Sequence, residues 1–277
     1  MGKAKTFYKL ARPQNSLITA ISVFIGAWVC EGIPSLTKLI LACMSAFLIS
    51  AGGYVINDYF DVEIDKINKP SRPLITGEIS KRTALSLSLI LFFLGFFLSL
   101  FMKLSAIFIA LFSILALIYY SFKLKKTLFW GNFLVSLICA LAFVYGGIAG
   151  KDLRWSLIPA IFAFLFHFGR EILKDMEDKE GDQLSGAKTT PIFLGVKPSL
   201  FFISLIFSVL LVLTCFPYIF KIFTIPYLLA VLIFDLLLLY VIWSLWRDWS
   251  TENLGRLSRI LKVDMILGLA AIFLGRF

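Results

Sequence analysis

Two acidic clusters hold the residues of this 277-residue chain that are best suited to chemistry. Each cluster has three aspartates with the same spacing, namely Asp58, Asp61 and Asp65 in the first and Asp175, Asp178 and Asp182 in the second. Positions i, i+3 and i+7 share one face of an α-helix, so each cluster is predicted to form an acidic stripe. Stacked carboxylates need a compensating cation. Carboxylate oxygens without His or Cys favour a hard cation such as Mg²⁺.

The two clusters belong to an internal repeat. The aspartates correspond at a constant offset of 117 residues, and the segments that follow, 72–77 and 190–195, are alike at an offset of 118. We therefore expect two related helical units whose acidic ends face one another. A single acidic stripe is usually a solvated helix face, but two matching copies at the ends of apolar runs favour a binding site. Because Mg²⁺ takes one or two carboxylates together with phosphate oxygens, such a site could hold a diphosphate.

The composition places these clusters in a membrane protein. Hydrophobic residues make up 60% of the chain and charged residues 16%, whereas soluble domains average roughly 25% charged residues. A single water-soluble core cannot bury that much apolar surface, but lipid can accept it. The formal charge of +10 is spread over loops between apolar runs, which is typical of contacts with lipid headgroups rather than of nucleic-acid binding.

Apolar runs of about 20 residues predict an all-α integral membrane protein with about nine transmembrane helices in one bundle. The predicted spans are 15–31, 39–60, 83–101, 105–122, 129–149, 156–172, 199–218, 224–246 and 260–275. With the N-terminus in the cytoplasm, the cytoplasmic segments hold every Lys and Arg except Lys38, Lys103, Lys151, Arg154, Lys221 and Arg276. This asymmetry predicts a multi-pass protein of the cell membrane with both acidic clusters on its cytoplasmic side.

At this point the sequence resembles a known family. The stretches Asn57-Asp58-x-x-Asp61-x-x-x-Asp65 and Asp175-x-x-Asp178-x-x-x-Asp182 are similar to the two signature motifs of the UbiA superfamily of intramembrane prenyltransferases. The resemblance covers essentially the whole chain, so residues 1–277 are expected to form a single domain of this type. It implies an enzyme that transfers a prenyl group from a prenyl diphosphate to an acceptor, with Mg²⁺ as cofactor. It also implies two metal-ligand sets, Asn57, Asp58 and Asp61 for one ion and Asp175 and Asp178 for the other.

The resemblance implies further site residues. Arg72, Lys123 and Lys188 are candidate cations for the diphosphate, and Tyr119-x-x-x-Lys123 matches a third family feature. An interfacial Tyr beside a Lys that reaches the headgroups would give the same pattern. The predicted catalytic residues are Asp61, Asp178, Arg72, Lys123 and Tyr119. The predicted substrate-binding residues are Arg12, Asn15, Asp65, Arg170, Lys188 and Asp182.

The acceptor follows from resemblance to a branch of the family alone. The second motif with its following Lys188-Thr189, and the start Arg12-Pro13-x-Asn15, resemble the branch that makes archaeal-type ether lipids. That branch transfers geranylgeranyl from its diphosphate to geranylgeranylglyceryl phosphate. Two alternatives stay open at this point. One is an aromatic acceptor, as in quinone or chlorophyll pathways, and the other is an ion-coupled transporter whose ion site is the repeated acidic cluster.

Overall fold

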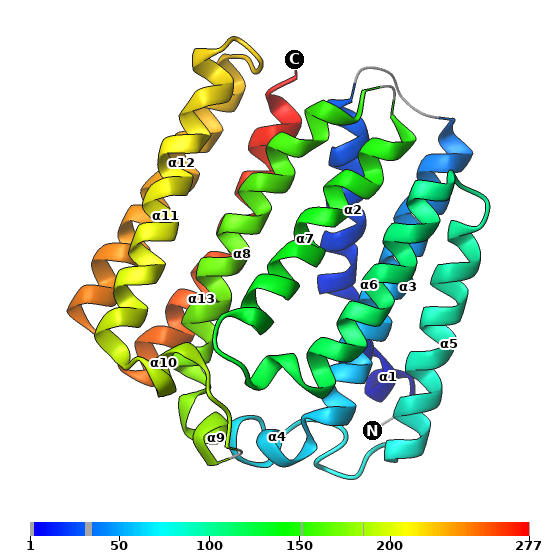
Figure 1. Cartoon of the computed structure of the whole chain (residues 1–277), viewed down its shortest axis with the longest axis vertical. Coiled ribbons are helices and arrows are strands. Elements are labelled where there is room, and N and C mark those ends of the chain that lie inside the picture. Colours follow the sequence, from blue (N-terminus) through cyan, green and yellow to red (C-terminus); the bar gives the residue numbers. More distant parts are fainter. Residues whose placement is uncertain (1–2, 31–34, 151, 185, 277) are drawn as a thin grey trace.

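The chain folds into a bundle of long helices (Figure 1). The computed structural model describes residues 3–30, 35–150, 152–184 and 186–276, so residue 31 of the first predicted span and Lys151 lie outside it. Within the described residues, each predicted span coincides with one long helix. These helices are α2 (Pro13–Val29), α3 (Leu36–Phe60), α5 (Lys81–Ser99), α6 (Leu104–Phe122), α7 (Trp130–Ala149), α8 (Leu157–Glu177), α11 (Val196–Ile219), α12 (Ile225–Arg247) and α13 (Thr251–Leu274).

Seven of the described helices are long and apolar enough to cross a membrane. They are α3, α5, α6, α7, α8 with the turn before it, α11 and α12. The other two long helices do not meet this description, for separate reasons. Helix α2 has only 17 residues, and α13 carries several charged residues in its first half. The two run side by side, because Trp28 of α2 stacks on Phe273 of α13 at 5.1 Å between ring centroids. That α2 and α13 also cross the membrane, which would give nine spans, therefore remains a prediction.

Two helices extend several residues beyond the predicted spans. Helix α8 continues to Glu177, past the predicted end at 172, so the second acidic cluster begins inside the helix. Helix α13 begins at Thr251 rather than at 260, where the Ser250 hydroxyl accepts a hydrogen bond from the backbone N–H of Asn253 at 3.3 Å. Both extensions have one cause, because hydropathy marks where lipid begins and a helix stabilised by a cap or by packing continues into the polar region.

The remaining elements are short and connect the long helices. They are α1 (Lys3–Ala11), α4 (Val62–Asn68), α9 (Lys179–Leu184), α10 (Thr190–Phe193) and the 3₁₀ turns η1 (Leu124–Lys126) and η2 (Leu153–Ser156). Helices α1, α4, α9 and α10 lie at one end of the bundle, and the C-terminus lies at the other (Figure 1). Both acidic clusters and the N-terminal helix are therefore at the same end.

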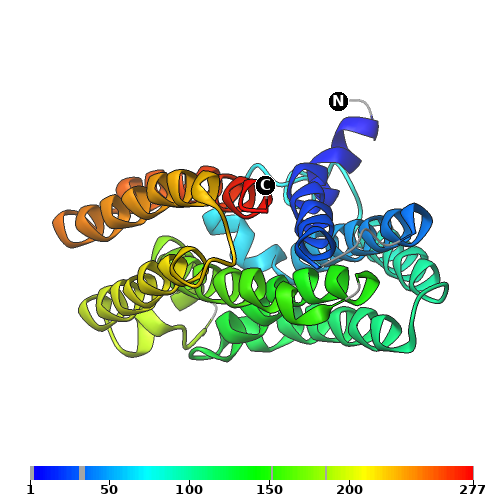
Figure 2. The ribbon, with the colours of Figure 1, turned by 90° about the horizontal axis from the view of Figure 1, so that it is seen from above.

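Helices α2 and α7 join the two halves of the bundle. One half contains α3, α5 and α6, the other contains α8, α11, α12 and α13, and α2 and α7 lie between them (Figures 1 and 2). The contact between α2 and α7 depends on glycine. A Cβ atom on Gly146 would lie 1.9 Å from the carbonyl oxygen of Val23, and one on Gly26 would lie 2.1 Å from that of Phe143. Small residues at such crossings let two membrane helices touch through their backbones.

The predicted repeat is confirmed by the backbone. Helices α3 and α8 are each interrupted at the middle aspartate of a motif, with φ −84° and ψ 4° at Asp61 and φ −89° and ψ 6° at Asp178. The short helices α4 and α9 follow these breaks. Further on, Gly77 and Gly195 occupy corresponding positions, and both adopt positive φ, 74° and 92°. Glycine adopts this conformation without the steric cost of a Cβ atom, so both units of the repeat have a glycine where the backbone takes positive φ.

The two units meet through α4 and α9, as the repeat predicts. A Cβ atom on Gly181 of α9 would lie 2.3 Å from Oδ1 of Asn68, the last residue of α4. The Asn68 side chain donates a hydrogen bond to the backbone carbonyl of Asp178 at 3.2 Å. This close contact brings the two acidic clusters to opposite sides of one space.

We predict that Gly146→Ala destabilises the protein. The added methyl group would overlap a backbone carbonyl, which cannot move aside as a flexible side chain can, and overpacking of this kind costs about 1–3 kcal/mol. The measurement is thermal unfolding of the purified protein in detergent. Gly255→Ala is the control, because its nearest neighbour is a Glu177 carboxylate oxygen at 3.3 Å. Equal melting temperatures for the two variants would contradict the backbone contact between α2 and α7.

Candidate active site

A cavity of about 710 Å³ lies between the two acidic clusters and extends into the bundle. One face of α3 lines it from Ala46 to Asn57, so the cavity follows this helix for three turns. At the motif end the wall is charged, with Asp58, Asp175 and Asp178. Deeper in the bundle the wall becomes apolar, through residues such as Ile49, Ala110, Leu117, Leu141 and Ala142. The cavity thus suits a molecule with a charged head and an apolar chain.

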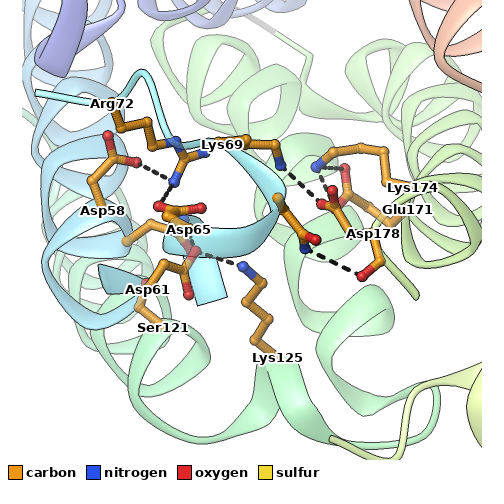
Figure 3. Close-up of polar contacts among 12 residues, drawn as sticks. Asp58, Asp61, Asp65, Lys69, Arg72, Ser121, Lys125, Glu171, Lys174 and Asp178 are labelled. Atoms are coloured by element: carbon orange, nitrogen blue, oxygen red, sulfur yellow. Dashed lines mark hydrogen bonds and ion pairs between the residues drawn. The ribbon is translucent and has the colours of Figure 1, made fainter. Parts of the chain in front are cut away.

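The first cluster is tied together by two arginines. Asp58 accepts from Arg12 at 2.5 Å and pairs with Arg72 at 3.0 Å. Arg72 also donates to Asp65, seven residues after Asp58 (Figure 3). A single guanidinium therefore bridges the carboxylates of Asp58 on α3 and Asp65 on α4, the two helices that meet at Asp61.

The middle aspartate of the first motif has different partners. Asp61 accepts from Asn57 Nδ2 at 2.6 Å and from Lys125 Nζ at 2.5 Å (Figure 3). Lys125 reaches the site from η1, the turn that follows α6. Burial by itself would lower the pKa of Lys125, but the charges of Asp61, Asp182 and Asp178 outweigh it and raise that pKa. Lys125 is therefore a permanent cation of the site.

The second cluster faces the first across the cavity. Asp178 pairs with Lys69 Nζ at 2.9 Å, a contact that crosses from the first unit to the second (Figure 3). Asp175 accepts from Asn132 Nδ2 at 2.8 Å. Burial raises the pKa of Asp65 to about 6 and that of Asp182 to about 6. Both carboxyls are therefore mostly ionised at neutral pH.

The charges of the two clusters do not cancel. Six carboxylates of the motifs face four cationic side chains, namely Arg12, Lys69, Arg72 and Lys125. Among the described residues, no three or more Asp, Glu, His or Cys side chains converge closely enough to hold a metal ion alone. Mg²⁺ does not require such a cage, because it is usually held by one or two carboxylates plus phosphate oxygens. The hard oxygen donors and their excess negative charge fit Mg²⁺ bound together with a phosphorylated substrate.

Arg12 owes its position to a strained backbone. It separates α1 from α2 and adopts the left-handed region, with φ 46° and ψ 58°. Pro13, at the first position of α2, disfavours helical geometry for the residue before it. The guanidinium then lies 5.2 Å from the ring centroid of Tyr54 while it binds Asp58. Backbone strain of this kind is characteristic of functional sites.

The structure brings most of the residues predicted from sequence to the cavity, but not all. Arg12, Asn15, Arg72 and Arg170 line it together with motif residues. Tyr119, Lys123 and Lys188 are exposed and do not line it. Asp61 and Asp65 are buried and are not among its lining residues either. On α6 it is the adjacent Tyr120 that faces the cavity, and in the following turn Lys125 reaches the carboxylates.

Three residues of the site were missed by sequence reasoning. Lys69 and Lys125 were counted only as basic loop residues, because nothing in the sequence distinguishes a lysine that turns inward from one that faces lipid headgroups. Asn132, which is 4% exposed, did carry a signal. A polar amide within an apolar run is costly in lipid and usually has a partner inside the protein.

A helical membrane bundle that encloses a cavity with a charged end and an apolar end is suited to an intramembrane enzyme acting on amphiphilic substrates. The UbiA prenyltransferase family model matches residues 19–262, and the chain belongs to this family. The protein is therefore an intramembrane prenyltransferase. Membership of this family replaces the alternative prediction of an ion-coupled transporter.

Several relatives are similar along nearly the whole chain. Digeranylgeranylglyceryl phosphate synthase of Sulfurisphaera tokodaii is 42% identical over 244 residues, which cover 86% of this chain and 87% of the relative. A solved structure described as digeranylgeranylglyceryl phosphate synthase is 38% identical, has a TM-score of 0.79, and covers 100% of this chain and 99% of its own. A UbiA homologue from Archaeoglobus fulgidus, solved bound to GPP and Mg²⁺, shares the fold at 20% identity with a TM-score of 0.68, covering 96% of this chain and 99% of its own.

We predict that Lys125→Met lowers the rate of prenyl transfer by about 100-fold, because it removes a cation that is fixed beside the carboxylates. Lys123→Met is the matched variant, since Lys123 lies two residues away and is exposed. It is expected to retain activity within about twofold. The measurement is the initial rate of both purified variants at saturating substrate. A larger loss for Lys123→Met would restore the role predicted from the sequence motif.

Proposed function

We propose that this protein transfers a geranylgeranyl group from geranylgeranyl diphosphate to geranylgeranylglyceryl phosphate. In this reaction the C1–O bond of the diphosphate breaks, an ether bond forms to the glycerol oxygen, and diphosphate and a proton are released. The observation that carries the reaction class is the amphiphilic cavity, with the carboxylate clusters at one end and an apolar wall at the other. The choice of acceptor is supported by the relatives named digeranylgeranylglyceryl phosphate synthase, at 33–42% identity over most of the chain.

We assign the metal-binding roles to the motif residues that the resemblance implies. Asn57, Asp58 and Asp61 would hold one Mg²⁺, and Asp175 and Asp178 the other. Mg²⁺ bound there supplies positive charge to the oxygens of the leaving diphosphate. The assignment is supported by the excess of carboxylates over cationic side chains at this end of the cavity.

The protein's own cations would complete the diphosphate site. Arg72 and Lys125 lie beside the first cluster and Lys69 lies beside the second, so together they surround the space where negative charge develops. Fixed donors in a partly buried site stabilise such charge more than water does. Arg72 is largely buried, with a side chain 14% exposed, so its charge is weakly screened. Asp65 and Asp182 would position the acceptor or bind through water.

The apolar part of the cavity would bind the prenyl chain and exclude water. Departure of the diphosphate leaves carbocation character on an allylic carbon, which aromatic faces stabilise and water would quench. Tyr54 and Tyr120 line the wall next to the charged end, and Tyr145 lies deeper. The apolar residues deeper in the cavity would contact the rest of the prenyl chain.

We also infer that residues 1–277 form one domain in the cell membrane, with the site open to the cytoplasm. The domain assignment is supported by contacts at both ends of the chain, since Leu10 of α1 is buried in the core and Phe273 packs on Trp28. The orientation is supported by the concentration of Lys and Arg in the segments on the motif side.

The acceptor is tested by a direct assay. The purified protein in detergent is incubated with Mg²⁺ and radiolabelled geranylgeranyl diphosphate. Geranylgeranylglyceryl phosphate and a hydroxybenzoate are supplied as parallel acceptors. We expect metal-dependent label in the doubly prenylated glycerol lipid. Label in the aromatic product alone would keep the reaction class and overturn the proposed acceptor.

The metal site is tested by removing one charge from each cluster. Asp61→Asn and Asp178→Asn are each expected to lower the transfer rate by about 100-fold or more, because they weaken the binding of Mg²⁺ and diphosphate. Chelation of the metal is expected to remove activity from the unchanged protein.

Glu63→Gln is the matched control for these substitutions. Glu63 is an acid of the same motif, but its side chain is 74% exposed and pairs with Lys66 on the surface. It is expected to keep nearly full activity. Thermal unfolding of each variant separates loss of the site from loss of the fold. A folded Asp61→Asn protein with full activity would rule out the proposed ligand set.

A further inference from the structure

A second group of cations lines the cavity from α8 and α13. Arg170 and Lys174 are one helical turn apart on α8, so they project from the same face. Lys262 projects from α13, which packs against α8. All three line the main cavity. None of them is paired with an aspartate of either motif by a described ion pair.

The positive charge of this group is only partly compensated. Glu171 binds Lys174 at 3.1 Å and lies 3.5 Å from Arg170. Among the described contacts, no ion pair or hydrogen bond engages Lys262, and Nε of Arg170 is buried without a hydrogen-bond partner. A buried donor without a partner is costly, so this group is suited to an anion.

An apolar cavity begins at the same cations. It measures about 140 Å³ and lies between α2, α7, α8, α12 and α13. Arg170 and Lys262 line both this cavity and the main one. From Lys262 the same face of α13 continues along the cavity through Met265, Leu269 and Ile272. Opposite them, Phe162 and Phe166 of α8 and Phe234 of α12 complete an apolar wall.

We propose that Arg170, Lys174 and Lys262 bind the phosphomonoester of the acceptor lipid, whose prenyl chain enters the smaller cavity. This inference rests on the proposed function and adds to it a second anion site, distinct from the diphosphate site at the aspartates. The three cations outnumber Glu171 and Glu177, the glutamates that line the cavity with them, so this part of the wall is positive. A phosphomonoester carries about −1.5 to −2 near neutral pH and is therefore attracted to it. Both anion sites open into the main cavity, so the acceptor hydroxyl can face the donor's reactive carbon.

Lys262 is the position at which to test this site. Arg170 is 9% exposed, and its replacement would disturb the packing of α8, whereas Lys262 is exposed. We expect Lys262→Gln to raise KM for geranylgeranylglyceryl phosphate by about tenfold or more, because a hydrogen bond to a charged group is lost. KM for geranylgeranyl diphosphate should be unchanged. Lys262→Arg should restore most of the affinity. Lys197→Gln, which removes an exposed lysine of α11, is the control and should behave as the unchanged protein.

Binding without turnover gives a readout that does not depend on the reaction. Affinity for geranylgeranylglyceryl phosphate is measured calorimetrically in detergent, with EDTA present and no donor. Lys262→Gln should weaken this binding about tenfold. It should leave the binding of geranylgeranylglycerol, which lacks the phosphate, unchanged. Inorganic phosphate at equal concentration should not displace the lipid, because it lacks the chain that fills the apolar cavity.

The outcomes separate the site from the proposed reaction. A parallel rise in both KM values would assign Lys262 to the diphosphate site, and unchanged binding of the phosphorylated lipid would overturn the proposal outright. If the unchanged protein transfers nothing to the glycerol lipid, the proposed function fails. The binding measurement then still decides whether Lys262 contacts a lipid phosphate.

Discussion

The aspartates of the two motifs lie where membrane helices end, and four of the six have less than 9% of their surface exposed. Carboxylates in such a place remain charged only when cations lie against them, since desolvation favours the neutral form. Arg12, Lys69, Arg72 and Lys125 meet this requirement in part, and they come from three segments near the motif end. The paths of those segments are consistent with the need to place cations against the aspartates. The strained turn at Arg12, the loop after α4 and the turn after α6 all deliver a cation to the same space.

The charge that these residues leave uncompensated connects the structure to its chemistry. A site with excess negative charge attracts a divalent cation, and a divalent cation with open positions attracts phosphate oxygens. The local cations then lie beside the leaving group rather than far from it. The charged end of the cavity is therefore preorganised for an anionic leaving group, while the apolar end holds a chain and keeps water away. Both properties come from one helix face on α3, which changes from Asn57 and Asp58 to Ile49 and Ala46 over three turns.

The internal repeat explains how two such clusters come to face one another, and where the symmetry ends. The breaks at Asp61 and Asp178 are nearly identical in backbone conformation, and the glycines at 77 and 195 both have positive φ. The surroundings differ, because the first cluster holds two arginines and a lysine, whereas the second has Lys69 from the opposite unit and Asn132 from α7. The second unit also carries Arg170 and Lys174 before its motif, where the first has Gly53 and Asn57. This asymmetry gives the cavity one side suited to a diphosphate and another suited to a second anion.

The sequence by itself determined the helical membrane class, the repeat and the pairing of the two acidic motifs. These features depend on local periodicity and composition, which a linear pattern preserves. Helix ends were less certain, because caps and packing rather than hydropathy decide where α8 and α13 stop and start. Only the tertiary structure decided which cations reach the carboxylates. Lys123 and Lys125 have the same charge and lie in the same short turn, yet one is exposed and the other contacts Asp61. The direction of a long flexible side chain depends on neighbours distant in sequence, so spacing along the chain cannot specify it.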